Sequence, residues 1–280
     1  RYNDFYIAGE SYGARAAIAV ATYIDKKTDI PLRFKGLMLG VGLVFPLMDI
    51  VDSANFLHTS GLLDEYGRRT LASWFEIIRA SVKRQELAKA ADELFKTVFN
   101  MPPVGQKTIF QGLTGFDHHG SIARTRQPLR VQKYFDYASS NEFKRIIHVG
   151  SDMALDKARR EVAMQLAIGN FFEDIEKKVK RVFETTRVLF YTAQMDAVFP
   201  AANIEQSLKD LPWSWQETLK TARRKPWYRN DNSSLELFGY EFKVGTFTYT
   251  KLLGGGHDVS MDQSEAVCEM FSRFLKSRRS

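Results

Sequence analysis

The sequence contains a single cysteine and no apolar run long enough to cross a membrane. Because Cys268 has no partner among the 280 residues, no internal disulfide can form, which argues against a disulfide-rich secreted domain. Spanning a bilayer takes about 20 consecutive apolar residues, and no stretch approaches that length, so we expect no membrane partner. No signal-peptide pattern is found either. Cys268 lies in a segment with helical apolar periodicity and is interpreted as a core residue.

The basic residues form no continuous patch, although the net charge is +7 and the pI is about 9.3. They occur as short clusters at 159–160, 177–178, 223–225 and 278–279. None of these clusters alternates with aromatic side chains, as a surface that stacks nucleic-acid bases would. We therefore expect solvated surface and no nucleic-acid partner.

The sequence also lacks a metal-binding pattern. His118 and His119 are adjacent, with Asp117 beside them, but no cysteine or carboxylate at ligand spacing completes a site. The polar surroundings of these residues predict an exposed loop. We expect neither a metal nor a cofactor.

The most informative motif is at residues 5–13, Phe-Tyr-Ile-Ala-Gly-Glu-Ser-Tyr-Gly. The apolar run at 5–8 predicts a buried strand, and the Ala-rich stretch at 14–23 predicts a helix. Between them lies G-x-S-x-G, and a strand before with a helix after is the context of a nucleophile elbow. Ser11 would then project from the carboxyl end of a sheet beside free helix N–H groups, which suit a developing negative charge. The N–H of Tyr12 is the predicted oxyanion donor.

The remaining pattern predicts an α/β core interrupted by a helical insertion. A second buried strand is expected at 34–40, and strand, helix and strand over about forty residues imply a parallel sheet with a right-handed crossover. Helical periodicity dominates residues 51–184, and strands return after them. We assign 1–50 and 185–280 to a core with a mainly parallel sheet, and 51–184 to a helical lid. Since the first strand begins within a few residues of the start, we expect further core strands upstream.

Two further residues follow predicted strands. Asp196 comes after the strand at 186–192, and His257 comes after the strand at 247–252, on a loop with three consecutive glycines. With Ser11 the chain order is Ser, Asp, His, which is the order of α/β-hydrolases. In that arrangement the histidine takes the proton of the serine and returns it to the leaving group. The aspartate orients the imidazole and stabilises its cation.

These motifs together resemble those of the serine carboxypeptidases, α/β-hydrolase peptidases that remove C-terminal residues. The similar segments are the nucleophile motif at 9–13, the strand and turn at 34–43, the acid after the strand at 186–192, and Gly254-Gly255-Gly256-His257 with Met261-Asp262-Gln263. Two segments of the lid resemble the vitellogenic-like branch of the family, namely Gly61-Leu62-Leu63-Asp64-Glu65 and Ile147-His148-Val149-Gly150.

The resemblance implies hydrolysis of the C-terminal peptide bond of peptides or proteins through an acyl-enzyme on Ser11. It also implies that Glu10 binds the terminal carboxylate of the substrate. That contact needs a proton on one of the two groups, which predicts activity favoured at acidic pH. The family resemblance further implies a secreted or lysosomal/vacuolar protein, and the sequon at Asn232 fits a glycoprotein. Whether the protein forms a homodimer stays open.

The chain departs from the family pattern in two respects. The glycine-rich loop that supplies the family's second oxyanion N–H is absent, together with several N-terminal sheet strands. Asp258 follows the histidine where relatives usually carry an apolar residue, and a charge there would alter the substrate pocket and disfavour apolar leaving residues. Two alternatives to a carboxypeptidase therefore stay open, a related acyltransferase and a non-catalytic fragment or binding protein that retains the fold.

Overall fold

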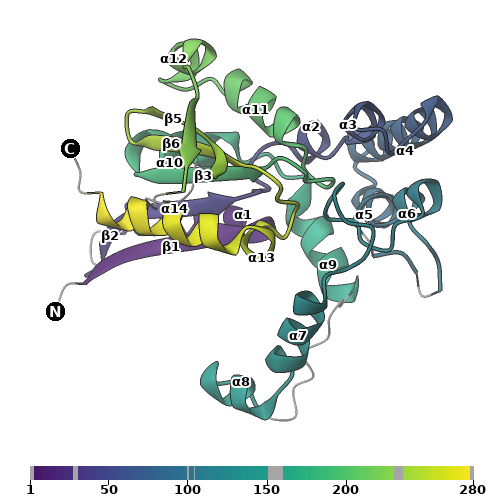
Figure 1. Ribbon diagram of the computed structural model, residues 1–280, viewed down its shortest axis with the longest axis horizontal. Coiled ribbons are helices and arrows are strands. Elements are labelled where there is room, and N and C mark those ends of the chain that lie inside the picture. The colour runs from purple at the N-terminus through teal and green to yellow at the C-terminus, as the bar shows by residue number, and fades with distance from the viewer. Residues whose placement is uncertain are drawn as a thin grey trace.

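A mixed β-sheet forms the centre of the computed structural model (Figure 1), which describes residues 3–27, 31–99, 101–103, 105–150, 160–229 and 236–277. Its strands are β1 (Asp4–Glu10), β2 (Arg33–Gly40), β3 (Val188–Ala193), β4 (Lys225–Tyr228), β5 (Leu237–Val244) and β6 (Phe247–Leu252). Their order in the sheet is β1-β2-β3-β6-β5-β4. The pairs β1–β2, β2–β3 and β3–β6 are parallel, whereas β6–β5 and β5–β4 are antiparallel. The predicted α/β class with a mainly parallel sheet is confirmed; β4 was not predicted.

Helices cover the sheet and fill the connection between β2 and β3. Those that follow strands of the sheet, or lead into them, are α1 (Tyr12–Lys26), α10 (Glu176–Thr185), α11 (Ala201–Asp210), α12 (Gln216–Thr221), α13 (Val259–Asp262) and α14 (Ser264–Lys276). The rest of this connection consists of α2 (Leu47–Ile50), α3 (Ala54–Thr59), α4 (Glu65–Lys83), α5 (Leu87–Phe95), α6 (Ile109–Thr114), α7 (Leu129–Ala138), α8 (Asn141–Ile146), α9 (Arg160–Leu166) and a π-helical turn, η1 (Ala167–Phe171).

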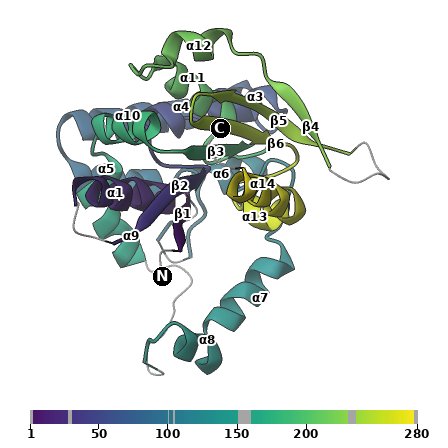
Figure 2. The same cartoon turned by 90° about the vertical axis from the view of Figure 1, so that its left-hand side faces the viewer.

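Alternating side chains of the central strands separate two apolar clusters. In β2, Leu37 and Leu39 belong to the larger cluster, which includes α1, whereas Met38 belongs to the cluster beneath α14. In β3, Phe190 faces the first cluster and Tyr191 the second. Successive residues of a strand point to opposite faces, and a strand covered on both faces is apolar throughout. Figure 2 shows α1 and α10 on one face of the sheet, with α13 and α14 on the other.

Strand β1 lies at the edge of the sheet, and the prediction that it is buried is wrong. Within the described residues it pairs with β2 alone, and its residues are exposed or half-buried. Phe5, for example, is 37% exposed. The apolar run correctly predicted a strand, but burial depends on what covers it on each side, and periodicity does not carry that information.

Among the described residues of 51–184, the named elements are helices, the type that the periodicity predicted. Figure 1 shows α3, α4, α5 and α6 grouped beside the sheet, and Figures 1 and 2 both show α7 and α8 projecting away from it. Helix α10, which leads into β3, lies apart from this group and packs against α1. In the same layer the ring of Phe183 lies 5.9 Å from that of Phe190 in β3. Among the described residues, no helix is both long enough and apolar enough to cross a membrane.

Three remaining expectations concern Cys268, the sequon at Asn232 and the basic residues near the C-terminus. Cys268 lies on α14 but is exposed, so its interpretation as a core residue is wrong. At about 100° per residue, the helix turns Val267 and Met270 toward the sheet and leaves residue 268 outside. The sequon at Asn232 and the basic residues at 278–279 lie outside the described residues.

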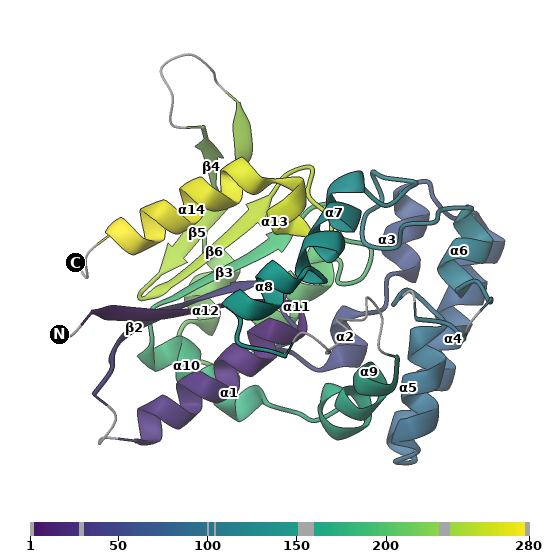
Figure 3. The ribbon, with the colours of Figure 1, turned by 90° about the horizontal axis from the view of Figure 1, so that it is seen from below.

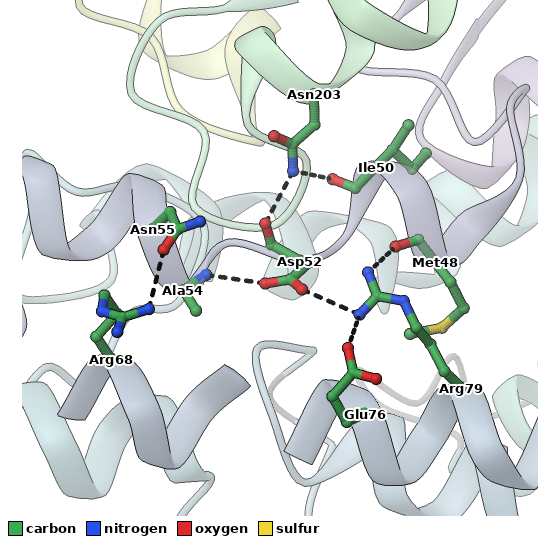
Figure 4. A network of polar contacts seen from close by, with 9 residues as sticks. All are labelled: Met48, Ile50, Asp52, Ala54, Asn55, Arg68, Glu76, Arg79 and Asn203. Atoms are coloured by element: carbon green, nitrogen blue, oxygen red, sulfur yellow. Dashed lines mark hydrogen bonds and ion pairs between the residues drawn. The ribbon is translucent and has the colours of Figure 1, made fainter. Parts of the chain in front are cut away.

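A polar network fastens the insertion to the core near its start (Figure 4). The guanidinium of Arg79 on α4 lies 3.1 Å from the Asp52 carboxylate and donates to the carbonyl of Met48 at 2.8 Å. From the core helix α11, Asn203 donates to the carbonyl of Asp52 at 2.8 Å. We call these four residues the Asp52 anchor. It joins α4 to α11 through a single connecting residue.

Candidate active site

Ser11 lies in the sharp turn between β1 and α1. Its φ of 53° is a conformation that residues other than glycine rarely adopt. The Ser11 N–H donates to the carbonyl of Gly40 at 2.9 Å, and the Ser11 carbonyl accepts from the N–H of Leu43 at 3.0 Å. Strand and helix approach so closely that a Cβ on Gly9 would lie 2.3 Å from the carbonyl oxygen of Gly13. The turn therefore holds Ser11 in one strained conformation at the carboxyl end of the sheet.

The structure brings Ser11, His257 and Asp196 into one hydrogen-bonded line. His257 Nε2 lies 2.9 Å from Ser11 Oγ, and His257 Nδ1 lies 2.9 Å from Asp196 Oδ2. These residues follow β1, β6 and β3, whose carboxyl ends meet at one edge because the strands run parallel. Such a line lets an imidazole take the proton of a hydroxyl while a carboxylate holds its tautomer.

Asp196 is fully buried, and both of its carboxylate oxygens have partners. Oδ2 faces the imidazole, while Oδ1 accepts the backbone N–H groups of Val198 at 2.8 Å and Phe199 at 2.9 Å. Hydrogen bonds to a charged acceptor are stronger than those between neutral groups. The three donors therefore stabilise a buried carboxylate in a fixed orientation.

The surroundings of His257 favour its protonated form. Burial by itself lowers the pKa of the imidazole, but the charge and hydrogen bond of Asp196, with the charges of Asp258 and Glu10, outweigh burial and raise the pKa above its ordinary value. The ring of Phe199 lies edge-on to the imidazole, with centroids 5.2 Å apart. The imidazole is thus held by an aromatic contact as well as by its two hydrogen bonds.

Tyr12, the predicted oxyanion donor, is the first residue of α1. Backbone N–H groups in the first turn of a helix have no intrahelical acceptor, and the helix dipole favours negative charge there. The Tyr12 ring packs on Phe171 of η1, with centroids 5.4 Å apart. This contact places the insertion directly over the start of α1.

Glu10 ends β1 and precedes Ser11. The Tyr191 hydroxyl donates to its Oε1 at 2.8 Å, and the Ser260 hydroxyl donates to its Oε2 at 3.0 Å. Burial raises the pKa of Glu10, and these two hydrogen bonds offset the effect only in part. Glu10 therefore keeps its proton to a higher pH than an ordinary glutamate and can donate it to an anionic group.

Asp258 directly follows His257 and is half-buried at the start of α13. Burial is the largest influence on the pKa values of Glu10, His118 and His257, and the Asp258 charge acts on all three in the direction of a higher pKa. The carboxylate of Asp258 is therefore within electrostatic reach of the reacting groups, where the sequence predicted a change in the substrate pocket.

One segment beside the site was missed at the sequence level. Residues 117–125, which we call the strap, run from the insertion along the loops that carry Asp196 and His257. Ser121 forms an antiparallel bridge with Asp196, and the carbonyl of Gly120 accepts the N–H of His257 at 2.7 Å. The polar residues of this segment gave no local signal for these contacts, which arise only when distant loops pack together.

His118 and His119 contradict the predicted exposed loop. His118 is 3% exposed, and Nδ1 of the half-buried His119 is enclosed without a hydrogen-bond partner among the described residues. Burial lowers the pKa of both imidazoles, and with the charges of His257 and His118 it lowers that of His119 to about 3. Both side chains are therefore neutral at neutral pH. The described residues contain no group of three or more His, Cys, Asp or Glu side chains that could hold a metal ion.

Comparison with known proteins identifies the family. The model of the serine carboxypeptidase family matches residues 1–277. The chain belongs to the serine carboxypeptidase family. The match covers nearly the whole chain, and it confirms the resemblance seen in the nucleophile and histidine motifs.

Individual relatives agree with this membership. Probable serine carboxypeptidase CPVL of Mus musculus is 30% identical, over 99% of this chain and 57% of that protein. Venom serine carboxypeptidase of Apis mellifera is 28% identical, over 99% of this chain and 58% of that protein. The crystal structure of KEX1(delta)p, a prohormone-processing carboxypeptidase from Saccharomyces cerevisiae, has the same fold, with a TM-score of 0.65 at 13% identity over 98% of this chain and 62% of that one. The chain therefore spans less than two thirds of the length of these relatives.

Proposed function

We propose that the protein is a serine carboxypeptidase that hydrolyses the last peptide bond of peptide or protein substrates. The observation that carries the proposal is the pair of 2.9 Å contacts from the His257 imidazole to Ser11 and to Asp196. Family membership supports the choice of a peptide substrate with a free C-terminus. No cofactor or metal takes part in the proposed reaction.

The proposed mechanism proceeds through an acyl-enzyme. Ser11 Oγ attacks the carbonyl carbon of the last peptide bond while His257 Nε2 takes the hydroxyl proton. The oxyanion accepts the N–H of Tyr12, and the imidazolium then gives its proton to the departing amine, which leaves as the free C-terminal amino acid. A water molecule, deprotonated by the imidazole, attacks the ester, and Ser11 recovers its proton.

We further propose that protonated Glu10 donates a hydrogen bond to the terminal carboxylate of the substrate. The protonated fraction of Glu10 falls as the pH rises through its pKa, and burial raises that pKa. The fraction of neutral His257 moves the opposite way. Peptide cleavage should therefore be favoured at lower pH and decline as the pH rises, whereas reactions at Ser11 that involve no carboxylate should not show this decline.

The substrate preference we propose is a basic C-terminal residue. Its support is the charge of Asp258, which lies beside His257 and the Glu10 carboxyl group. A leaving Lys or Arg side chain would pair with this carboxylate, whereas an apolar side chain would partly desolvate it. We also propose a secretory or lysosomal location, since one relative is named a venom carboxypeptidase.

The test combines active-site labelling with peptide cleavage. The full-length natural protein is treated with a fluorophosphonate, with Ser11→Ala as the control, and the labelled residue is identified by mass spectrometry. Two peptides of one sequence are then compared, one with a free C-terminal carboxylate and one with a C-terminal amide. Labelling at Ser11 with loss of one residue from the free acid alone is the expected result.

Other results would select the alternatives. Labelling without cleavage of either peptide would contradict the peptidase and favour an acyltransferase. Absence of labelling would contradict any Ser11 chemistry and favour a binding protein that retains the fold.

A further inference from the structure

The strap bonds to both loops that hold the partners of Ser11. Its Ile122 N–H donates to the carbonyl of Met195 at 3.0 Å, in the loop after β3. Its Gly120 carbonyl accepts the N–H of His257 at 2.7 Å, in the loop after β6. A segment of the insertion therefore braces two core loops, which are also joined directly where the N–H of Met195 donates to the carbonyl of Gly255 at 2.8 Å.

One buried carboxylate extends this contact to the residue before His257. The Asp262 side chain on α13 is 2% exposed, and its Oδ2 accepts the N–H of Gly256 at 2.8 Å. Its Oδ1 lies 3.1 Å from the guanidinium of Arg124, which belongs to the strap. The packing here is close, because a Cβ on Gly256 would lie 2.5 Å from Cβ of Ser121. Arg124, Asp262 and Gly256 thus form one continuous link.

We propose that Arg124 and Asp262 are positioning residues for the His257 imidazole. This inference rests on the proposed function and deepens it, because it gives the insertion a part in assembling the site. The backbone of His257 is held on both sides, by its own N–H to the strap and by the preceding N–H to Asp262. The link from Arg124 keeps that second hydrogen bond in place.

Loss of Arg124 would leave the Asp262 carboxylate buried without its counter-ion. An unpaired buried charge is costly, so the loop would shift or the carboxylate would take up a proton. Either change weakens the bond to the Gly256 N–H and lets the next residue move. A misplacement of reacting groups by about 1 Å can lower a rate by about 100-fold.

A matched control, a second arginine that also contacts α13, distinguishes positioning from a purely structural role. Arg130 of α7 donates to the carbonyl of Met261, also in α13, without touching the Asp262 link. Figure 3 shows α7 lying beside α13. Arg130→Met removes an arginine contact between the insertion and α13. Arg124→Met removes the ion pair with Asp262, whose carboxylate also accepts the N–H of Gly256.

The experiment uses the full-length natural protein and its Arg124→Met, Arg124→Lys, Asp262→Asn and Arg130→Met variants. Measured are the rate of fluorophosphonate labelling at Ser11, kcat and KM for peptide cleavage, thermal unfolding, and the NMR signal of the His257 ring N–H. We expect Arg124→Met and Asp262→Asn to lower the labelling rate and kcat about 10- to 100-fold with little change in KM. Arg124→Lys should recover most of the rate, and Arg130→Met should keep it.

Combining Arg124→Met with Asp262→Asn should cost no more than one change alone, because both break one link. Equal effects of Arg124→Met and Arg130→Met, or a lower unfolding temperature with unchanged kcat, would overturn the proposal. If the wild type neither labels nor cleaves, the proposed function fails, and the NMR signal still decides positioning. A shifted or broadened His257 signal in Arg124→Met but not in Arg130→Met would then sustain it, and an unchanged signal would overturn it.

Discussion

Arg79 and Arg124, two arginines of the insertion, each pair with a carboxylate, and the two pairs have nearly the same geometry. Arg79 lies 3.1 Å from Asp52, and Arg124 lies 3.1 Å from Asp262. The side chains of the two arginines are 33% and 31% exposed. The carboxylates differ, because that of Asp52 is 28% exposed and that of Asp262 only 2%.

The second difference is what each carboxylate holds besides its arginine. Asp52 accepts the N–H of Ala54, at the start of a helix of the insertion. Asp262 accepts the N–H of Gly256, next to the histidine that faces Ser11. Two pairs of equal length thus have unequal consequences, because the value of an ion pair depends on its burial and on the groups its partner also binds. The predictions below test this contrast, from the largest expected effect on activity to the smallest.

The largest effect should come from Asp196, which the strap bridges and the Asp52 anchor does not touch. Replacing it by Asn keeps the size of the side chain but removes the charge that orients and stabilises the imidazolium. In serine-protease triads this change lowers kcat about 10⁴-fold, and we expect a similar loss in peptide cleavage. Steady-state kinetics of Asp196→Asn, with Asp52→Asn as control, would measure it. A loss below about tenfold would mean that the aspartate does not act through His257.

The contrast between the two pairs also marks where sequence reasoning stopped. Local patterns predicted the parallel strands of the core and the order of Ser11, Asp196 and His257, because apolar runs and strand ends are written in consecutive residues. The structure brings those three side chains together. The strap was not predicted, since its polar residues are buried only by loops from elsewhere in the chain. For the same reason, the predictions that β1 is buried and that Cys268 is a core residue were wrong.

A smaller effect should come from Glu10, which neither arginine pair touches. Glu10→Gln supplies an amide donor at every pH, so the decline of peptide kcat/KM with rising pH should disappear, with about a tenfold gain over the wild type one unit above the wild-type midpoint. The raised pKa of Glu10 sets the direction, because the acid form is the active donor and is lost as the pH rises. Measuring pH profiles for both peptide cleavage and fluorophosphonate labelling tests this. The labelling profile should move only slightly to lower pH in Glu10→Gln, because the lost charge is one of the influences that raise the pKa of His257. A decline of peptide cleavage with rising pH that persists in Glu10→Gln would contradict the assigned role.

A further step down in effect is expected at Asp258, the residue before the short helix α13, whose side chain takes no part in the side-chain contacts of Asp262. Asp258→Asn should lower the preference for C-terminal Lys over Leu about 3- to 5-fold, since a partly solvated ion pair contributes roughly 1 kcal/mol or less. Ratios of kcat/KM for two peptides that differ only in the last residue give the preference directly. Glu217→Gln, a change in an exposed carboxylate on α12, is the control for net charge. An unchanged ratio would remove Asp258 from the substrate pocket.

The smallest effect on activity should come from Arg79→Met, which removes the partly solvated pair between Arg79 and Asp52. This change removes a pair of the same length as Arg124 and Asp262, together with a hydrogen bond to Met48. Because Asp52 is partly solvated, its carboxylate can exchange the arginine for water, so the free energy of unfolding should fall by only about 1 kcal/mol. Urea unfolding measures that loss, and kcat should stay within twofold of the wild type. A large fall in kcat would show that the insertion acts on the site as one rigid body, and the distinction between the two pairs would then disappear.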